Sequence, residues 1–264
     1  MSPVGGDGWR PPRAGTLIGA GAAMLALGAL FRLLPWLDLW VSDLFHVTGQ
    51  GFVLRDGWLP VLLYRAVNWL QIVAVAALVL IGAVWLWRRS PPFGLNPRAT
   101  LLFAGTLAIG SGLLVNAVFK DQWGRARPAQ IERYGGPLAF TPPALMADQC
   151  ERNCSFTAGH PALIFAGFGF ALGLAGARRR RAVIAVAAVG GVVGLGRVVQ
   201  GGHFLSDVLF SGLICFAVAA ALAMLLPGAM ARWPGRAKFG AAEAAALRSG
   251  AAALAKTGGD ALAA

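Results

Sequence analysis

The chain has 264 residues, of which 57% are hydrophobic and only 13% are charged, and its mean hydropathy is +0.65. A soluble domain of this size carries roughly 25% charged residues, so the composition argues against a soluble fold and for lipid as the main solvent. The net charge of +12 does not indicate nucleic acid, because the arginines lie between the hydrophobic runs instead of forming one stripe. Basic residues placed in this way report orientation in a membrane.

Six apolar runs approach or exceed the length of about 20 helical residues that crosses a bilayer. They cover residues 16–34, 59–87, 100–119, 161–177, 182–199 and 204–226. The first run continues without a cleavage site and is expected to be a span, not a removed signal peptide. Pro227 and Gly228 are expected to end the last run. The sequence therefore predicts an all-α, polytopic membrane protein with a six-transmembrane-helix bundle.

Basic residues gather in the connectors that a six-span arrangement brings to one side of the membrane. They are Arg10, Arg13, Arg88, Arg89, Arg98, the run from Arg178 to Arg181, Arg232, Arg236 and Lys238. An excess of such residues marks the cytoplasmic side. We therefore expect a cytoplasmic segment at 1–15, a six-helix domain at 16–228 and a cytoplasmic Ala/Gly-rich tail at 229–264, in a bacterial inner membrane.

The opposite, periplasmic face is expected to hold residues 35–58, 120–160 and 197–207. Two of these segments, 120–160 and 197–207, carry a set of cations and two of the three histidines of the chain: Lys120, Arg127, His160, Arg197 and His203. Lysine supplies a point charge and arginine a planar fork, and both suit the oxygens of a phosphate. The sequence therefore predicts a basic pocket for a charged oxyanion at the periplasmic membrane face.

His203 and Asp207 are four residues apart at the start of the last span, so they share one helical face. A carboxylate in that position holds an imidazole in one tautomer and stabilises its charged form. His160 precedes Pro161, a residue favoured at the first position of a helix. Two imidazoles beside a cationic cluster provide a nucleophile and an acid.

These segments resemble the three signature motifs of the type 2 phosphatidic acid phosphatase family of membrane lipid phosphatases. The family pattern is K-x-x-x-x-x-x-R-P, then P-S-G-H, then S-R-x-x-x-x-x-H-x-x-x-D. The matching residues, in order, are Lys120, Arg127, Pro128, Gly159, His160, Arg197, His203 and Asp207. Thr157 and Ala158 replace the usual Pro and Ser of the second motif, and Gly196 replaces the first Ser of the third.

The resemblance implies that His203 attacks phosphorus and forms a phosphohistidine, with Asp207 orienting its ring and His160 protonating the leaving oxygen. It also implies phosphate binding by Lys120, Arg127, Arg197 and the backbone of Gly159. We expect no metal, since the cationic cluster would repel one, and no cofactor. Ser155 or Thr157 is expected to replace the missing serine hydroxyl, and Arg125 to meet either a further anionic group of the substrate or a lipid head group.

Residues 153–156 and the stretch before Pro128 resemble lipid A phosphatases of Gram-negative bacteria, particularly those acting at the 4′-phosphate. Lipid A is therefore the favoured substrate, followed by undecaprenyl diphosphate and phosphatidylglycerophosphate. An anion transporter and a non-catalytic lipid-binding protein remain alternatives of another class. The expected partners are a lipid phosphate and membrane lipids, without nucleic acid or an obligate protein partner. Cys150 and Cys154 either form a disulfide in the oxidising periplasm or remain thiols; the sequence leaves both open.

Overall fold

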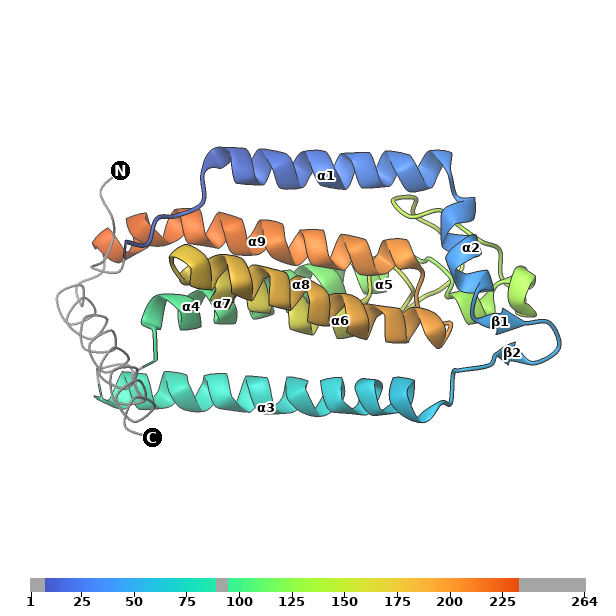
Figure 1. The fold of residues 1–264 in the computed structure, drawn as a ribbon, viewed down its shortest axis with the longest axis horizontal. Helices are drawn as coiled ribbons and strands as arrows, with labels where there is room; N and C mark the ends of the chain where they lie inside the picture. Colours follow the sequence, from blue (N-terminus) through green and yellow to red (C-terminus); the bar gives the residue numbers. More distant parts are fainter. Residues whose placement is uncertain (1–7, 89–94, 233–264) are drawn as a thin grey trace, which may run out of the picture.

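The computed structural model describes residues 8–88 and 95–232 of the chain. Long helices lie side by side in one bundle, and a short hairpin and several loops gather at one end (Figure 1). Arg89, Arg236, Lys238 and most of the expected Ala/Gly-rich tail lie outside the described residues. The expected all-α architecture is confirmed, because the strands among the described residues are limited to one two-residue pair.

The elements in chain order are α1 (Ala14–Leu33), α2 (Trp36–Asp43), β1 (His46–Val47), β2 (Gly51–Phe52), α3 (Trp58–Arg88), α4 (Pro97–Gly105), η2 (Thr106–Phe119), α5 (Lys120–Gln122), η3 (Pro128–Gln130), η4 (Glu132–Tyr134), α6 (Gly159–Phe165), α7 (Gly167–Gly173), α8 (Gly176–Val199) and α9 (Leu205–Arg232). Strands β1 and β2 are antiparallel, with His46 opposite Phe52. Helix α1 lies along α9 on one side of the bundle, while α3 lies on the opposite side and packs on α8 and α6 (Figure 1).

Five of the described helices are long and apolar enough to cross a membrane: Ala14–Leu33, Trp58–Arg88, Pro97–Gln122, Gly176–Val199 and Leu205–Pro227. The sixth expected span is a shorter apolar stretch, Gly159–Gly173, which Ala166 divides into α6 and α7. The last membrane-crossing segment ends at Pro227, as expected, but the helix was expected to end there too and instead continues to Arg232 with the proline inside it. A proline removes one helical N–H, and membrane helices tolerate that loss.

The third span is a continuous run of α4, η2 and α5 that ends at the predicted site. It begins at Asn96, whose side chain accepts a hydrogen bond from the N–H of Ala99 at 3.1 Å, and Pro97 follows at the first helical position. Its middle part is wound as a π-helix, in which Asn116 donates to the carbonyl of Ser111, five residues earlier, at 2.7 Å. The span ends in α5, which begins with Lys120.

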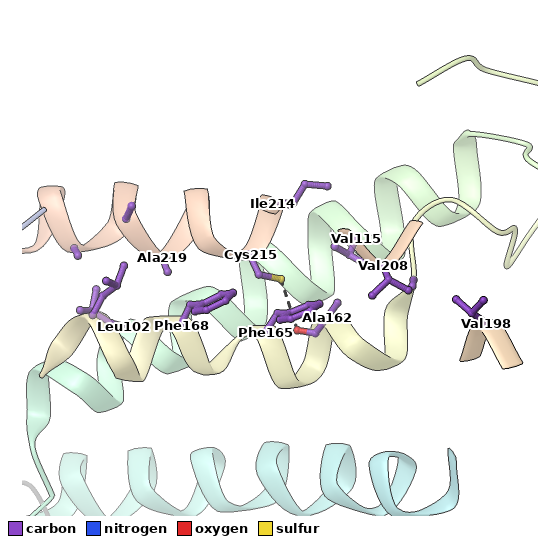
Figure 2. Packing of buried hydrophobic residues seen from close by; sticks show 14 of the residues in the cluster. Leu102, Val115, Ala162, Phe165, Phe168, Val198, Val208, Ile214, Cys215 and Ala219 are labelled. Atoms are coloured by element: carbon purple, nitrogen blue, oxygen red, sulfur yellow. Dashed lines mark hydrogen bonds between the residues drawn. The ribbon is translucent and has the colours of Figure 1, made fainter. Parts of the chain in front are cut away.

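Small residues let the central helices approach each other closely. A Cβ atom at Gly169 of α7 would lie 2.5 Å from the Thr106 hydroxyl and would overlap the Leu102 carbonyl. The side chains of Leu102 and Phe168 belong to the same buried cluster as Cys215 of α9. The thiol of Cys215 points at the carbonyl of Ala162 at 3.6 Å (Figure 2). Because lipid gives no hydrophobic drive for helices to associate, such close packing is what holds them together.

Gly169→Ala is expected to lower the melting temperature in detergent, because the added methyl group must displace backbone. Overpacking of this kind costs about 1–3 kcal/mol. Gly191→Ala, in α8, is the control, since nothing lies within 4 Å of a Cβ atom there. Thermal unfolding followed by circular dichroism measures both variants, and equal melting temperatures would contradict the close packing of α7 on α4.

Candidate active site

The three motif segments meet at the end of the bundle that also holds α2 and the hairpin (Figure 1). Backbone hydrogen bonds join the segments to one another. The N–H of Cys154 donates to the carbonyl of Lys120 at 2.9 Å, and the N–H of Ala129 donates to the carbonyl of Gly201 at 3.0 Å. The N–H of Ala158 donates to the carbonyl of Asp207 at 3.3 Å. The three motif segments therefore lie against one another.

His203 is buried, with 1% of its surface exposed. Its Nδ1 lies 2.7 Å from the carbonyl oxygen of Ser155 and 3.7 Å from a carboxylate oxygen of Asp207. Since a carbonyl oxygen only accepts, Nδ1 carries the proton and Nε2 keeps its lone pair. Burial, with a smaller contribution from the charge of Lys120, lowers the pKa of His203 to about 4, although Asp207 opposes the change. The ring is therefore neutral at neutral pH.

Asp207 lies in the first turn of α9, where a carboxylate complements the helix dipole. One of its oxygens accepts from the N–H of Phe204 at 2.9 Å and from the hydroxyl of Ser155 at 2.5 Å. The other accepts from Arg125 at 2.5 Å. The sequence predicted that Asp207 holds the imidazole; in the structure the carbonyl of Ser155 is the nearer partner, and the carboxylate lies just beyond it.

His160 lies against two residues of α3 that the motifs do not include. Its Nε2 is 3.0 Å from the side-chain oxygen of Asn68, and its ring stacks on Tyr64 with 4.5 Å between centroids. An amide oxygen only accepts, so Nε2 carries a proton and Nδ1 has the lone pair. Sequence reasoning missed both residues, although two polar side chains four apart in an apolar run share one helical face.

Two motif arginines form part of a polar cavity of about 540 Å³. Arg127 donates to the carbonyl of Asn153 at 2.6 Å, and burial lowers its pKa. Arg197 bonds to Gln200 and lies over the ring of Tyr64 at 4.8 Å, while its buried Nε has no hydrogen-bond partner among the described residues. The remaining side chains around the cavity include Arg55, Asp56, Tyr64, Gln130, Arg152 and Gln200.

Lys120 reaches the start of α6 because position 159 is glycine. A Cβ atom at Gly159 would lie 3.1 Å from the Lys120 ammonium and would overlap the side-chain oxygen of Asn116. Glycine thus leaves room for the ammonium group beside His160. The second motif therefore requires glycine at this position because a larger residue would not fit, and not because the backbone there needs flexibility.

Three of the expected substrate contacts lie elsewhere than the sequence suggested. Arg125 is fully buried and binds Asp207 instead of lining the cavity. Ser155 is also buried and donates to Asp207, because this hydroxyl points toward the start of α9. Thr157 is buried, and within the described part of the chain its hydroxyl has no partner.

The structure joins Cys150 and Cys154, which are four positions apart in the sequence, in a disulfide that closes a short loop. The loop lies against the first motif, since the N–H of Asn153 donates to the Asp121 carboxylate at 3.0 Å. The guanidinium of Arg127, also in the first motif, donates to the carbonyl of the same Asn153. The loop therefore helps to fix the guanidinium of Arg127 at the cavity.

The PAP2 superfamily matches residues 99–230, which make up half of the chain and contain all three motifs. The chain belongs to the PAP2 superfamily. The resemblance that the motifs suggested is therefore confirmed at the level of the family. Tyr64 and Asn68, which contact His160, lie outside the matched segment.

Three similar proteins are each named Lipid A 4'-phosphatase. The one from Francisella tularensis subsp. novicida (strain U112) is 41% identical over 145 residues, 54% of this chain and 63% of that protein. The one from Rhizobium leguminosarum is 33% identical over 222 residues, 76% of this chain and 91% of that protein. The one from Rhizobium etli is 32% identical over 244 residues, 82% of this chain and 92% of that protein. No solved structure matches the chain.

Proposed function

We propose that the protein is a membrane phosphatase that removes a phosphate from lipid A through a phosphohistidine intermediate on His203. The observation that carries the proposal is the buried, neutral His203, whose Nδ1 is occupied by the Ser155 carbonyl so that Nε2 is the nucleophilic atom. The cavity lined by Arg127, Arg197 and Gly202, the residue that precedes His203, suits a phosphate group. The name shared by the three similar proteins supports lipid A as the substrate.

In the first step, Nε2 of His203 attacks phosphorus in line, and an N–P bond forms as the P–O bond to the lipid breaks. The leaving oxygen takes a proton from Nδ1 of His160, which enters this step protonated on both ring nitrogens and leaves it neutral, with Nε2–H still bonded to Asn68. Lys120, Arg127 and Arg197 stabilise the charge on the phosphoryl oxygens, which is the main catalytic contribution in phosphoryl transfer. The carboxylate of Asp207, 3.7 Å from Nδ1, stabilises the positive charge that develops on the imidazole.

In the second step, His160 takes a proton from a water molecule, which attacks the phosphohistidine from the side that the lipid has left. The N–P bond breaks, inorganic phosphate leaves, and His203 returns to its neutral form. Asn68 and Tyr64 hold the ring of His160 through a hydrogen bond and a stacking contact, so that the same residue serves both steps.

The chemistry requires no metal ion in this proposal, because Lys120, Arg127 and Arg197 already supply positive charge where a metal would. A divalent cation would meet electrostatic repulsion from the same three groups. Among the described residues, no three His, Cys, Asp or Glu side chains come together as a metal site.

The proposed location is the bacterial inner membrane, with both termini in the cytoplasm and the active site facing the periplasm. The distribution of basic residues supports this orientation, since Arg10, Arg13 and the run from Arg178 to Arg181 lie at the end of the bundle away from the motifs. The Cys150–Cys154 disulfide suits an oxidising compartment.

Two further arginines, Arg55 and Arg152, line the cavity beside the motif arginines and come from loops outside the motifs. The backbone of Arg55 is held by Gln200, whose amide donates to its carbonyl at 3.3 Å. Arg152 lies inside the loop that the disulfide closes. In this proposal they bind a second anionic group of the lipid, while the motif residues bind the phosphate that is removed.

Purified protein in detergent with EDTA is expected to release inorganic phosphate from lipid A, and faster than from phosphatidylglycerophosphate or undecaprenyl diphosphate. His203→Ala should abolish release, while His160→Ala should slow it about 100- to 10,000-fold, the usual contribution of general acid catalysis. His46→Ala is the matched control, since His46 packs on Phe52 and Tyr134. Binding or transport of the lipid phosphate without any release would contradict the proposal.

The pH dependence of kcat/KM should show an acid limb near pH 4. Protonation of Nε2 removes the nucleophile, and burial holds the pKa of His203 at about 4, so activity is lost only as the pH falls through that value. Asp207→Asn should move the limb to still lower pH, because the carboxylate favours the charged ring. Phosphate release measured between about pH 3.5 and 8 tests this; an acid limb near the ordinary histidine value would be inconsistent with a buried nucleophile.

Arg55→Gln and Arg152→Gln should each raise KM about 5- to 10-fold for bisphosphorylated lipid A, with kcat unchanged. For lipid A that carries only the phosphate to be removed, KM should stay the same, since the second anion is missing. Arg133→Gln is the control, because Arg133 is paired with Asp43 away from the cavity. Equal effects on both substrates would rule out a second anion subsite.

A further inference from the structure

A cluster of buried charges lies beside the catalytic pair and does not line the cavity. Asp38, Arg125 and Asp207 are each fully buried. Arg125 bridges the two carboxylates, with one nitrogen 2.8 Å from Asp38 and another 2.5 Å from Asp207. One guanidinium therefore serves two carboxylates that are far apart in the sequence.

Arg125 is fixed on every side. Its Nε donates to the carbonyl of Thr141 at 2.7 Å. Its guanidinium lies over the ring of Phe204 at 4.2 Å and near that of Phe140 at 5.6 Å. Because both the edge and the face of the group are occupied, its position relative to Asp207 is set by packing as well as by charge.

Asp38 also contacts the first turn of α9 directly. Its two oxygens accept from the N–H of Ser206 at 2.9 Å and from the hydroxyl of Ser206 at 2.5 Å. Ser206 is the residue before Asp207, and its hydroxyl accepts from Arg125 at 2.9 Å. Helix α2 thus reaches the active-site carboxylate by two routes, through a guanidinium and through a hydroxyl.

The charges in this cluster do not balance while His203 is neutral. Two carboxylates share one guanidinium, and burial together with the charge of Asp207 raises the pKa of Asp38, which reflects the cost of the second negative charge. An unbalanced buried charge is costly, and a positive charge close by reduces the cost. In the proposed reaction that positive charge appears on the imidazole of His203 when it takes the phosphoryl group.

We infer that Asp38 is a positioning residue for the phosphatase reaction, acting through Arg125 and Ser206 on Asp207. It holds the Asp207 carboxylate beside the His203 ring and supplies the second negative charge that favours the phosphorylated ring. The inference rests on the proposed function and extends the active site to α2, outside the segment that the family matches.

The test compares Asp38→Asn with Asp43→Asn, a variant of the same helix in which the lost carboxylate forms a largely exposed pair with Arg133. Asp38→Asn is expected to lower kcat about 10- to 100-fold, as loss of a supporting contact does, with KM within about twofold. Asp43→Asn should leave kcat unchanged. Phosphate release from lipid A is normalised to folded protein by size-exclusion chromatography and thermal unfolding.

Two further variants separate positioning from simple stabilisation of α2. In an Asp207→Asn background, Asp38→Asn should have little further effect on kcat, because its route to the ring is already lost. Ser206→Ala keeps every charge and should lower kcat about 3- to 10-fold. If Asp38→Asn does not fold, Ser206→Ala decides the question, since an unchanged kcat would overturn the inference.

If the wild type is active and folded Asp38→Asn has the same kcat, the inference is overturned and the proposed function stays intact. A loss of thermal stability with normal kcat per folded molecule would have the same meaning, because it is what a merely structural role predicts. Absence of phosphate release by the wild type would overturn both proposals together.

Discussion

Arg125 donates to two carboxylates from different parts of the chain, Asp38 on α2 and Asp207 in the first turn of α9. Arg125 occupies one oxygen of Asp207. The other oxygen accepts from the hydroxyl of Ser155 and the N–H of Phe204. Ser155 in turn presents its carbonyl to Nδ1 of His203. The orientation of the proposed nucleophile thus depends on a buried network in which each group has a charged or hydrogen-bonded partner.

The packing of the helices makes this network possible. Close contact of α7 with α4, which Gly169 permits, holds the third and fourth spans together. Phe168 of α7 and Cys215 of α9 belong to the buried cluster between these helices (Figure 2). Lys120 in α5, His160 in α6 and Asp207 in α9 lie at the ends of these spans, so close packing in the bundle fixes their separation. Lipid surrounds the bundle, whereas the site is polar and lies at its end.

The sequence predicted the all-α bundle, the six apolar runs and the three motif segments that meet at one end. These features depend on local composition and spacing, which a single chain displays directly. The sequence also predicted a basic pocket, and Arg127 and Arg197 line one cavity in the structure. Hydropathy did not reveal the break at Ala166, nor that α9 continues through Pro227, because both depend on how the helix is packed and hydrogen-bonded.

The supporting residues could not be predicted in the same way. Asn68 and Asp38 meet the site only through tertiary packing, since they lie more than 90 and 160 residues from their partners His160 and Ser206. Arg125 was expected at the substrate because an arginine beside a phosphate motif resembles a ligand-binding group. Its burial against two carboxylates is a property of the fold, which no spacing within the motif records.

Trapping of the covalent intermediate tests the central claim most directly. Lipid A labelled with radioactive phosphate at the position to be removed is mixed with enzyme, and the reaction is stopped in alkaline denaturant, in which phosphohistidine survives. The account predicts a labelled protein whose label is lost in acid, lies on the peptide that contains His203 and is absent from His203→Ala. Phosphate release by the wild type without any label on that peptide, or with equal labelling of His203→Ala, would contradict it.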